Sequence, residues 1–252
     1  MPSSPLQKKI RTSAARPGWR QRALRWRARV DDFEERRATP SRTAVSLLVA
    51  LAAAIVFLLL AQEVTAGRTT KLDEALSLWL HGYDAPWLDR VMFAMTRIGS
   101  YWTVVPMTAL VAAWTMSRRR WRTALVLVAS VVSAMLLTTT AKLLFQRARP
   151  SLFEKTMLPP SFSFPSGHAL VSMASYGTMA LVVAHLAPRW RLPVHAAAFP
   201  MIVLIGVSRV YLGVHWTTDI AAGFAAGGII VLAARHALGE VAREAENVDR
   251  AQ

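Results

Sequence analysis

Three short stretches of the sequence combine basic residues, histidines and an aspartate in a way that suits phosphate chemistry. They read KLLFQRARP from Lys142, FPSGH up to His168, and SRVYLGVHWTTD up to Asp219. Arginine presents a planar fork that matches phosphate oxygens, and lysine adds a compact point charge. If the three stretches meet in space, they supply both positive charge for a phosphate group and titratable groups for proton transfer.

Three basic residues are the candidate phosphate-binding side chains: Lys142, Arg149 and Arg209. Taken alone, Lys142 is typical of a lysine that reaches to the membrane surface from an apolar segment. Arg149, which stands directly before a proline, is typical of a charged loop residue. Arg209 is harder to explain in this way, because it lies within or at the end of an apolar run, where charge is costly.

The stretch Pro165-Ser166-Gly167-His168 directly precedes a long apolar run and predicts a turn that opens a helix. Backbone N–H groups at the start of a helix bind anions, and glycine lets the backbone approach a ligand closely. Ser166 and Gly167 are therefore candidate phosphate-binding residues through their backbone. The alternative is an ordinary helix start in which His168 merely lies at the boundary between lipid and water.

His215 and Asp219 are four residues apart and share one face if a helix starts at this point. An aspartate in this position can keep one ring nitrogen protonated and leave the other free to attack. The same pair could also be a simple contact at a helix start. His168, on a different helix, would be placed to protonate a leaving oxygen.

The elements that must position these residues are apolar segments long enough to span a membrane. The chain of 252 residues is 54% hydrophobic, with a mean hydropathy of +0.31. A helix needs about 20 apolar residues to cross a bilayer. The sequence therefore predicts an all-α polytopic membrane protein with six transmembrane helices, at about 43–62, 98–116, 123–145, 168–187, 193–214 and 218–238.

The chain divides into a basic arm (1–42), a six-span domain (43–238) and a polar tail (239–252). The arm carries twelve Lys and Arg against four acidic residues, so it supplies +8 of the net charge of +15. Such a charge could indicate a nucleic-acid partner. Because the remaining charge lies mostly at the ends of apolar runs, we expect anionic lipid headgroups and no nucleic acid as partners of the arm.

The segment 71–90, between the first two predicted spans, carries Leu72, Leu76, Trp79 and Leu80 at helical spacing. This pattern predicts a helix that lies on the membrane surface. A connector that packs on its neighbours is the alternative. The chain has no cysteine, which excludes disulfides, thiolate catalysis and cysteine-ligated metals.

Six spans place both termini on the same side of the membrane, and basic residues decide which side that is. With the amino terminus inside, the cytoplasmic side carries 21 Lys and Arg and the other side nine. Without the arm the numbers are equal, so the arm sets the expected orientation. The three stretches then meet at the outer ends of spans three to six, which predicts an active site facing away from the cytoplasm.

The spacing K-x6-R-P, P-S-G-H and S-R-x5-H-x3-D resembles that of the type-2 phosphatidic acid phosphatase superfamily. This superfamily also contains bacterial acid phosphatases and vanadium haloperoxidases. All three motifs are complete and in order here, and the resemblance covers about residues 43–238. It implies a membrane phosphatase. We expect catalysis without a metal or cofactor, because Lys and Arg already supply positive charge and no cluster of carboxylates or cysteines could hold an ion. The composition, rich in Ala and Arg, together with the resemblance indicates a bacterial cytoplasmic (inner) membrane.

The resemblance also implies a role for each matched residue. His215 would be the nucleophile that forms a phosphohistidine, Asp219 would orient it, and His168 would act as general acid and then as general base. The phosphoryl oxygens would be held by the side chains of Lys142, Arg149 and Arg209 and by the backbone of Ser166 and Gly167.

The resulting prediction is a lipid phosphate or diphosphate phosphatase. Polyprenyl diphosphates such as undecaprenyl diphosphate are favoured as substrates, ahead of phosphatidate or phosphatidylglycerophosphate. A lipid phosphotransferase that uses the same phosphoenzyme is one alternative. A haloperoxidase is a weaker one, because six spans suit a lipid and not a diffusible halide. A membrane protein that binds or transports phospholipid without catalysis is an alternative of another class.

Overall fold

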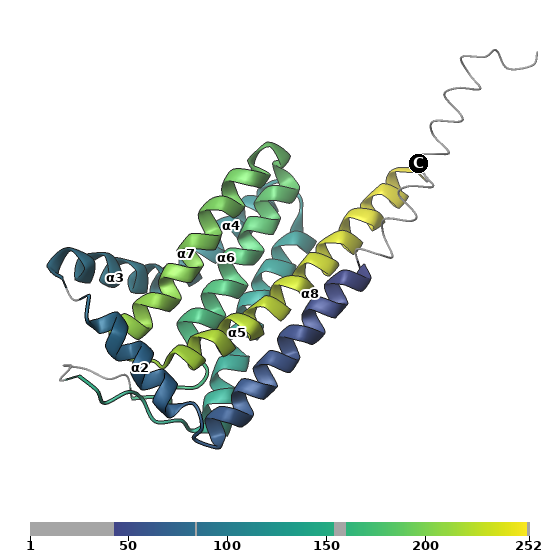
Figure 1. The fold of residues 1–252 in the computed structure, drawn as a ribbon. Coiled ribbons are helices and arrows are strands. Elements are labelled where there is room, and N and C mark those ends of the chain that lie inside the picture. The colour runs from purple at the N-terminus through teal and green to yellow at the C-terminus, as the bar shows by residue number, and fades with distance from the viewer. Residues whose placement is uncertain (1–42, 84, 154–159, 251–252) are drawn as a thin grey trace, which may run out of the picture. The chain divides into compact units, whose positions relative to one another are not determined.

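The structure, a computed structural model, describes residues 43–83, 85–153 and 160–250, and side chains up to residue 243. The predicted basic arm lies outside these residues. Within them, all regular secondary structure is helical (Figure 1). After a first helix at Thr43–Thr65, the elements are α2 (Thr70–His81), α3 (Pro86–Ile98), α4 (Tyr101–Ser117), α5 (Trp121–Phe145), α6 (Gly167–Leu186), η2 (Pro188–Trp190), α7 (Arg191–Tyr211) and α8 (Thr217–Arg250).

Five helical segments are long and apolar enough to cross a membrane: Thr43–Thr65, Trp121–Phe145, Gly167–Leu186, Pro188–Tyr211 and Thr217–Arg243. The remaining predicted span, the second (98–116), corresponds to α4, which has 17 residues and contains Pro106. Its length is slightly below the about 20 residues that a full crossing takes. Many large apolar side chains on these helices point outward, including Leu136, Leu144 and Phe199, as suits a surface that faces lipid.

Helix α6 is the central element of the bundle. It packs against α8, α7 and α5, and most of its residues are buried. Small residues let it approach α8 closely: a Cβ added at Gly223 would lie 2.8 Å from Ala169 Cβ, and one at Gly227 would lie 2.7 Å from Met173 Cβ. Close backbone approach at small residues is the usual way in which membrane helices associate. The start of α6, where the PSGH stretch lies, is thereby fixed against the start of α8.

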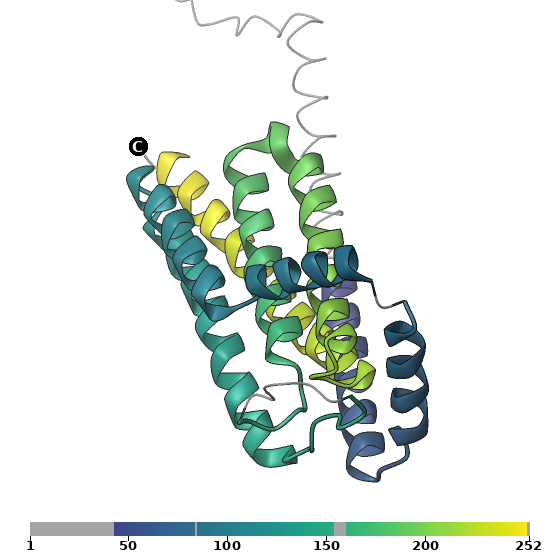
Figure 2. The same cartoon turned by 90° about the vertical axis from the view of Figure 1, so that its left-hand side faces the viewer.

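The segment 71–90 forms α2 and the first turns of α3 and does not form one continuous helix. The inward face of α2 is polar, because Asp73 and Ser77 are buried, whereas Leu72 and Trp79 are more than half exposed. Helix α3 runs across the long helices (Figures 1 and 2) and packs mainly on α7. The two helices therefore lie beside the ends of α7 and α8, where the third motif is found.

The predicted helix limits differ from the observed ones mainly at two ends. The fifth predicted span, 193–214, is shorter in the structure, because α7 ends at Tyr211 and Gly213 adopts a φ of +64° in the following turn. A positive φ favours glycine and ends a helix. The sixth, 218–238, is longer, because α8 continues to Arg250 through most of the predicted polar tail.

Candidate active site

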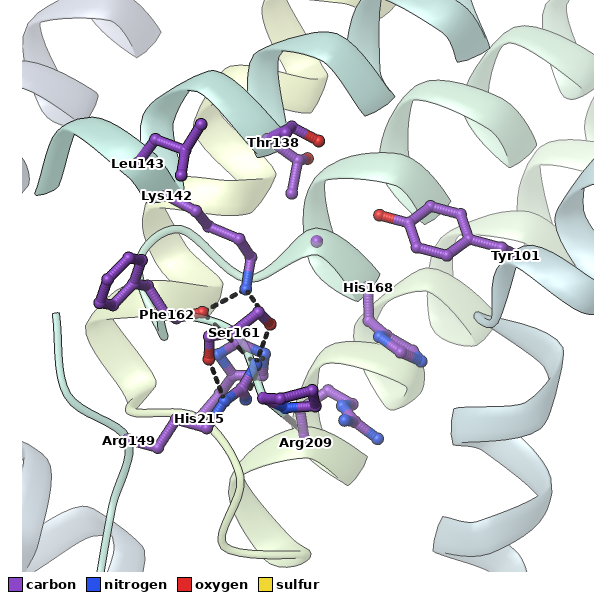
Figure 3. Close-up of a pocket in the computed structure, with 13 residues that line it drawn as sticks. Tyr101, Thr138, Lys142, Leu143, Arg149, Ser161, Phe162, His168, Arg209 and His215 are labelled. Atoms are coloured by element: carbon purple, nitrogen blue, oxygen red, sulfur yellow. Dashed lines mark hydrogen bonds between the residues drawn. The ribbon is translucent and has the colours of Figure 1, made fainter. Parts of the chain in front are cut away.

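The three motifs meet around one cavity of about 430 Å³ (Figure 3). Its walls come from α4, α5, α6, α7, the loop after α5 and the turn before α8. Every predicted side chain with a cationic or imidazole group lines it: Lys142, Arg149, His168, Arg209 and His215. Gly167 also lines the cavity, whereas Ser166 and Asp219 are buried behind it.

His215 is oriented by Asp219. Its Nδ1 lies 3.2 Å from Oδ2 of Asp219, and both side chains are almost completely buried. The same Oδ2 accepts hydrogen bonds from the N–H of Trp216, at 3.0 Å, and from the hydroxyl of Ser163. A carboxylate that faces Nδ1 requires the proton on that nitrogen. The lone pair therefore lies on Nε2, which is 3.3 Å from Nη1 of Arg149.

Burial is the main cause that lowers the pKa of His215 to about 4. The hydrogen bond and charge of Asp219 act in the opposite direction, whereas Arg149 and Arg209 lower the pKa further. Histidine has an ordinary pKa of about 6.5. His215 is therefore a neutral imidazole at neutral pH, which is the form that a nucleophile needs.

Lys142 and Arg149 are held by uncharged groups of the segment before PSGH. Lys142 Nζ donates to the carbonyl of Phe162 and lies 3.5 Å from Ser161 Oγ. Arg149 donates to the carbonyl of Ser161, at 2.7 Å, and to that of Val214, at 2.6 Å. Among the described residues, neither cation pairs with a carboxylate. Their charge is therefore directed by carbonyls and still available to an anion.

Helix α3 fixes the other side of the site through Thr96. Arg209, on α7, donates to the Thr96 hydroxyl, and the ring of His168 hydrogen-bonds to the Thr96 carbonyl. The Nε of Arg209 is buried and has no hydrogen-bond partner among the described residues. Buried polar groups are rarely left unpaired. Because the atom has no contact with solvent, a ligand in the cavity can reach this donor only after a shift of the arginine side chain.

Helix α6 begins at Gly167, with Ser166 as its N-cap residue in an extended conformation. The N–H of Ser166 donates to the main-chain carbonyl of Asp219 at 3.1 Å. Of the two predicted backbone donors, Gly167 is the one whose N–H has no partner among the described residues. A Cβ at Gly167 would lie 3.0 Å from Thr138 Cγ2 and 3.3 Å from the Tyr101 hydroxyl, so a side chain would crowd this wall.

Several further residues shape the site although they are not among the predicted site residues. They are Asp73, Thr96, Tyr101, Thr138, Arg147 and Ser163. Arg147 stands inside the first motif, and Asp73 is an acidic residue in an apolar helical segment. A charged side chain in such a segment is costly unless it is paired with an opposite charge. The presence of one acidic and one basic residue of this kind is the sequence feature that could have indicated the pair. The hydroxyl residues carry no comparable signal.

The fold and the cavity together define a helical membrane protein with a cationic, histidine-containing site at the helix ends. The profile of the PAP2 superfamily matches residues 123–242. Phosphatidylglycerophosphatase B of Bacillus subtilis (strain 168) is 33% identical over 174 residues, which cover 68% of this chain and 85% of that protein. The chain therefore belongs to the PAP2 superfamily.

Two further comparisons agree with this assignment. The undecaprenyl-diphosphatase of Sulfolobus acidocaldarius is 33% identical over 148 residues, 57% of this chain and 67% of that protein. The crystal structure of the transmembrane PAP2-type phosphatidylglycerolphosphate phosphatase from Bacillus subtilis superposes with a TM-score of 0.70 at 29% identity. The superposition covers 74% of this chain and 94% of that one. With its apolar helices and these relatives, the chain is a multi-pass membrane protein.

Proposed function

We propose that the protein is an integral-membrane phosphatase that hydrolyses a lipid phosphate or diphosphate through a phosphohistidine. One observation carries the proposal: two histidines and three cationic side chains, from α5, α6, α7, the loop after α5 and the turn before α8, line a single cavity. The names of the relatives, a phosphatidylglycerophosphatase and an undecaprenyl-diphosphatase, support the same reaction class.

In this proposal the phosphoryl group binds among the cations. Its oxygens are held by the side chains of Lys142, Arg149 and Arg209, and by the N–H of Gly167 at the start of α6. The guanidinium forks and the helix start direct donors at charge that grows in the transition state, which is where such donors accelerate a reaction.

The first chemical step is attack by Nε2 of His215 on phosphorus. The Nε2–P bond forms while the bond from phosphorus to the leaving oxygen breaks, and His168 gives that oxygen a proton. Asp219 accepts the Nδ1–H hydrogen bond and stabilises the positive charge that grows on the His215 ring.

The second step returns the enzyme to its starting state. A water molecule attacks phosphorus and gives its proton to His168, which the first step left as a base. The N–P bond then breaks, Nε2 regains its lone pair, and inorganic phosphate leaves. Both steps use the same cations and the same pair of histidines.

Metal independence is part of the proposal, because side chains already supply three positive charges. Among the described residues, no group of three or more His, Cys, Asp or Glu is placed to hold a metal ion. Activity should therefore persist in a chelator and be inhibited by vanadate, which adopts the geometry of the phosphoryl transition state. Loss of activity in a chelator that magnesium restores would contradict this part.

A lipid substrate is supported by the wall of the cavity that α4 and α5 form. Tyr101, Thr138 and Thr139 offer hydroxyl groups, and Leu143 is 63% exposed on the outer surface of α5. A headgroup can thus reach the cations while its chains stay beside apolar helices. We place polyprenyl diphosphates first, because their terminal phosphate has a second phosphate as leaving group, and phosphatidylglycerophosphate and phosphatidate next.

The experiment that tests the function is phosphate release by the purified protein in detergent. The panel should contain a polyprenyl diphosphate, phosphatidylglycerophosphate, phosphatidate and a water-soluble phosphate monoester. Release from lipids well above the soluble ester is expected. A hundredfold preference for phosphatidylglycerophosphate over the polyprenyl diphosphate would reverse our order of substrates, and a preference for the soluble ester would exclude a lipid phosphatase.

We further propose six spans, with α4 as the second, and α2 and α3 lying at the membrane interface. Both termini would be cytoplasmic in a bacterial inner membrane, with the cavity on the opposite face. The domain limits would be a basic arm at 1–42 near anionic headgroups, the phosphatase domain at 43–238 and a tail at 239–252. The exposed apolar residues Leu72, Trp79 and Trp87 on α2 and α3 support an interfacial position.

A further inference from the structure

Arg147 lies in the first motif but does not line the cavity; it joins two buried carboxylates behind it. Its Nη1 lies 2.6 Å from Oδ1 of Asp219, and its Nη2 lies 2.7 Å from Oδ2 of Asp73. Both aspartates are completely buried, and the arginine side chain is only 12% exposed. The guanidinium also lies 5.5 Å from the ring centroid of Trp216, which covers one of its faces.

Asp73 ties this arginine to the first turn of α8. Its Oδ1 accepts the N–H of Thr218 at 3.0 Å, and its Oδ2 accepts the Thr218 hydroxyl at 2.7 Å. Asp73 comes from α2, which lies outside the residues that match the family profile. A helix remote in sequence therefore contributes a charged side chain that contacts the residue next to Asp219.

The two oxygens of Asp219 have separate tasks. Oδ1 faces Arg147, whereas Oδ2 faces His215, Ser163 and the Trp216 N–H. Because each oxygen has its own donors, the carboxylate cannot rotate without losing charge-assisted hydrogen bonds. The direction of Oδ2, and with it the orientation of the imidazole, therefore depends on the contact of Arg147 with the other oxygen.

We propose that Asp73 and Arg147 are positioning residues that lock Asp219, and through it His215, in the attacking geometry. Helix α2 is then part of the catalytic apparatus and not only a connector. A buried ion pair is a poor means of gaining stability alone, because desolvation of the charges opposes their attraction. The presence of this buried ion pair is better explained if it positions the carboxylate of Asp219.

The proposal rests on the proposed function, and it implies that the charges of Arg147 and Asp73 affect the protonation of His215. Loss of the Arg147 charge leaves Asp219, which contacts His215, and Asp73 behind it with less compensation, so the imidazolium form is favoured and the pKa of His215 rises. Loss of the Asp73 charge leaves Arg147 less compensated and has the opposite effect. The charged or titratable groups that already face His215 are Asp219, Arg149, Arg209 and His168.

The test compares Arg147→Gln, Arg147→Lys, Asp73→Asn and the double variant Asp73→Asn/Arg147→Gln with the wild type. Arg147→Gln should lower kcat about 10²-fold with little change in KM, because small misplacement of a reacting group has effects of this size. Arg147→Lys, which keeps the charge, should recover part of the loss. The double variant should be no worse than Arg147→Gln, as expected for residues that act as a unit.

The acid limb of the pH profile of kcat/KM should move up in Arg147→Gln and down in Asp73→Asn. A purely structural ion pair would lower the unfolding temperature in detergent and leave both the limb and kcat of the folded fraction unchanged. The matched control is Arg68→Gln, which breaks the exposed 2.6 Å pair with Glu63 just before α2. It should leave kcat and the pH profile unchanged.

A readout without turnover separates this inference from the proposed function. The pH dependence of His215 carbethoxylation, followed by mass spectrometry, should shift in the same directions in the two charge variants. If the wild type releases no phosphate from any lipid, the proposed function fails and this arm still decides the positioning role. Unchanged carbethoxylation profiles in the folded charge variants would overturn the inference, and so would wild-type kcat in folded Arg147→Gln.

Discussion

Each histidine of the cavity has one ring nitrogen held by the protein, which leaves the other for a substrate. His215 is held by the carboxylate of Asp219, and His168 by the main-chain carbonyl of Thr96. The difference between these partners matters, because a carboxylate stabilises a positive ring much more than a carbonyl does. At the residue scale, this asymmetry supports the proposal that His215 attacks and His168 transfers protons.

His215→Ala should abolish phosphate release, because the covalent route has no other nucleophile. The measurement is single-turnover release together with trapping of an acid-labile phosphoenzyme from a labelled substrate. The control is His195→Ala on α7, whose Nδ1 contacts the Arg191 carbonyl at 2.7 Å and which does not line the cavity. It should keep wild-type activity. A phosphoenzyme in the His215 variant would refute the assignment.

The acid limb of kcat/KM should lie near pH 4. Burial lowers the pKa of His215 to about 4, so the free enzyme keeps a neutral imidazole well below the ordinary histidine range of about 6.5. Activity is therefore expected to be lost only as the pH falls through about 4. The same shift lowers stability on acidification, because from about pH 6.5 downward only the unfolded state takes up the proton. A limb at pH 6.5 would mean that His215 is solvated.

The residues that line the cavity could be predicted, because each of the three motifs can be recognised in the sequence without knowledge of the fold. Two features could not be predicted in this way. The N–H of Ser166 is engaged by the Asp219 carbonyl, which depends on how closely α6 and α8 begin together. The contact of Arg147 with Asp73 spans 74 residues. A charged residue in an apolar segment is expected to have a partner, but nothing in the sequence indicates which residue that partner is.

At the element scale, the site depends on the close approach of α6 and α8. A Cβ at Gly223 would lie 2.8 Å from Ala169 Cβ and 2.9 Å from the Ser166 carbonyl oxygen. Either the helices separate or the Ser166 turn shifts, and the turn carries Gly167 and His168. The residues that keep the two helices together thus also fix the distance between His168, the proposed proton donor, and His215, the proposed nucleophile.

Gly223→Ala should therefore reduce both thermal stability and kcat. The expected loss of stability is about 1–3 kcal/mol, the usual cost of inserting a methyl group into a well-packed core. Stability is measured by unfolding in detergent, and kcat by phosphate release. Gly239→Ala is the matched control in the same helix, because a Cβ there meets nothing within 4 Å. It should be neutral or slightly stabilising, since alanine has the higher helix propensity. Equal effects of Gly223→Ala and Gly239→Ala would show that α6 and α8 are not closely packed at Gly223.

The existence and order of the long helices could be predicted from apolar length alone, but the roles of α2 and α3 could not. The spacing of Leu72, Leu76 and Trp79 indicates a helix, and α2 is one. Its buried face, however, carries Asp73 and Ser77. In a soluble protein the apolar stripe would face inward. Beside lipid the apolar stripe can face outward and the polar residues inward. Which of the polar residues are paired then depends on the neighbouring helices, and the sequence of α2 alone does not show this.

At the scale of the whole molecule, the distribution of charge serves two purposes that conflict. Basic residues on the outer side of a membrane oppose the usual orientation, yet the cavity needs Lys142, Arg149 and Arg209 on whichever face it lies. With the amino terminus inside, 21 Lys and Arg lie on the cytoplasmic side and nine on the other, and twelve of the 21 belong to the arm. The arm is thus expected to outweigh the charge that the site requires.

This balance predicts opposite accessibility for the two ends of the bundle. Ser151, in the loop after α5, and Ser117, at the end of α4, are both exposed, and the chain has no native cysteine. In intact cells an impermeant thiol reagent should label Ser151→Cys and not Ser117→Cys, whereas permeabilised cells should show both. The reverse pattern would place the cavity in the cytoplasm. Shortening the arm should weaken the orientation, because the remaining charges are equal at nine and nine.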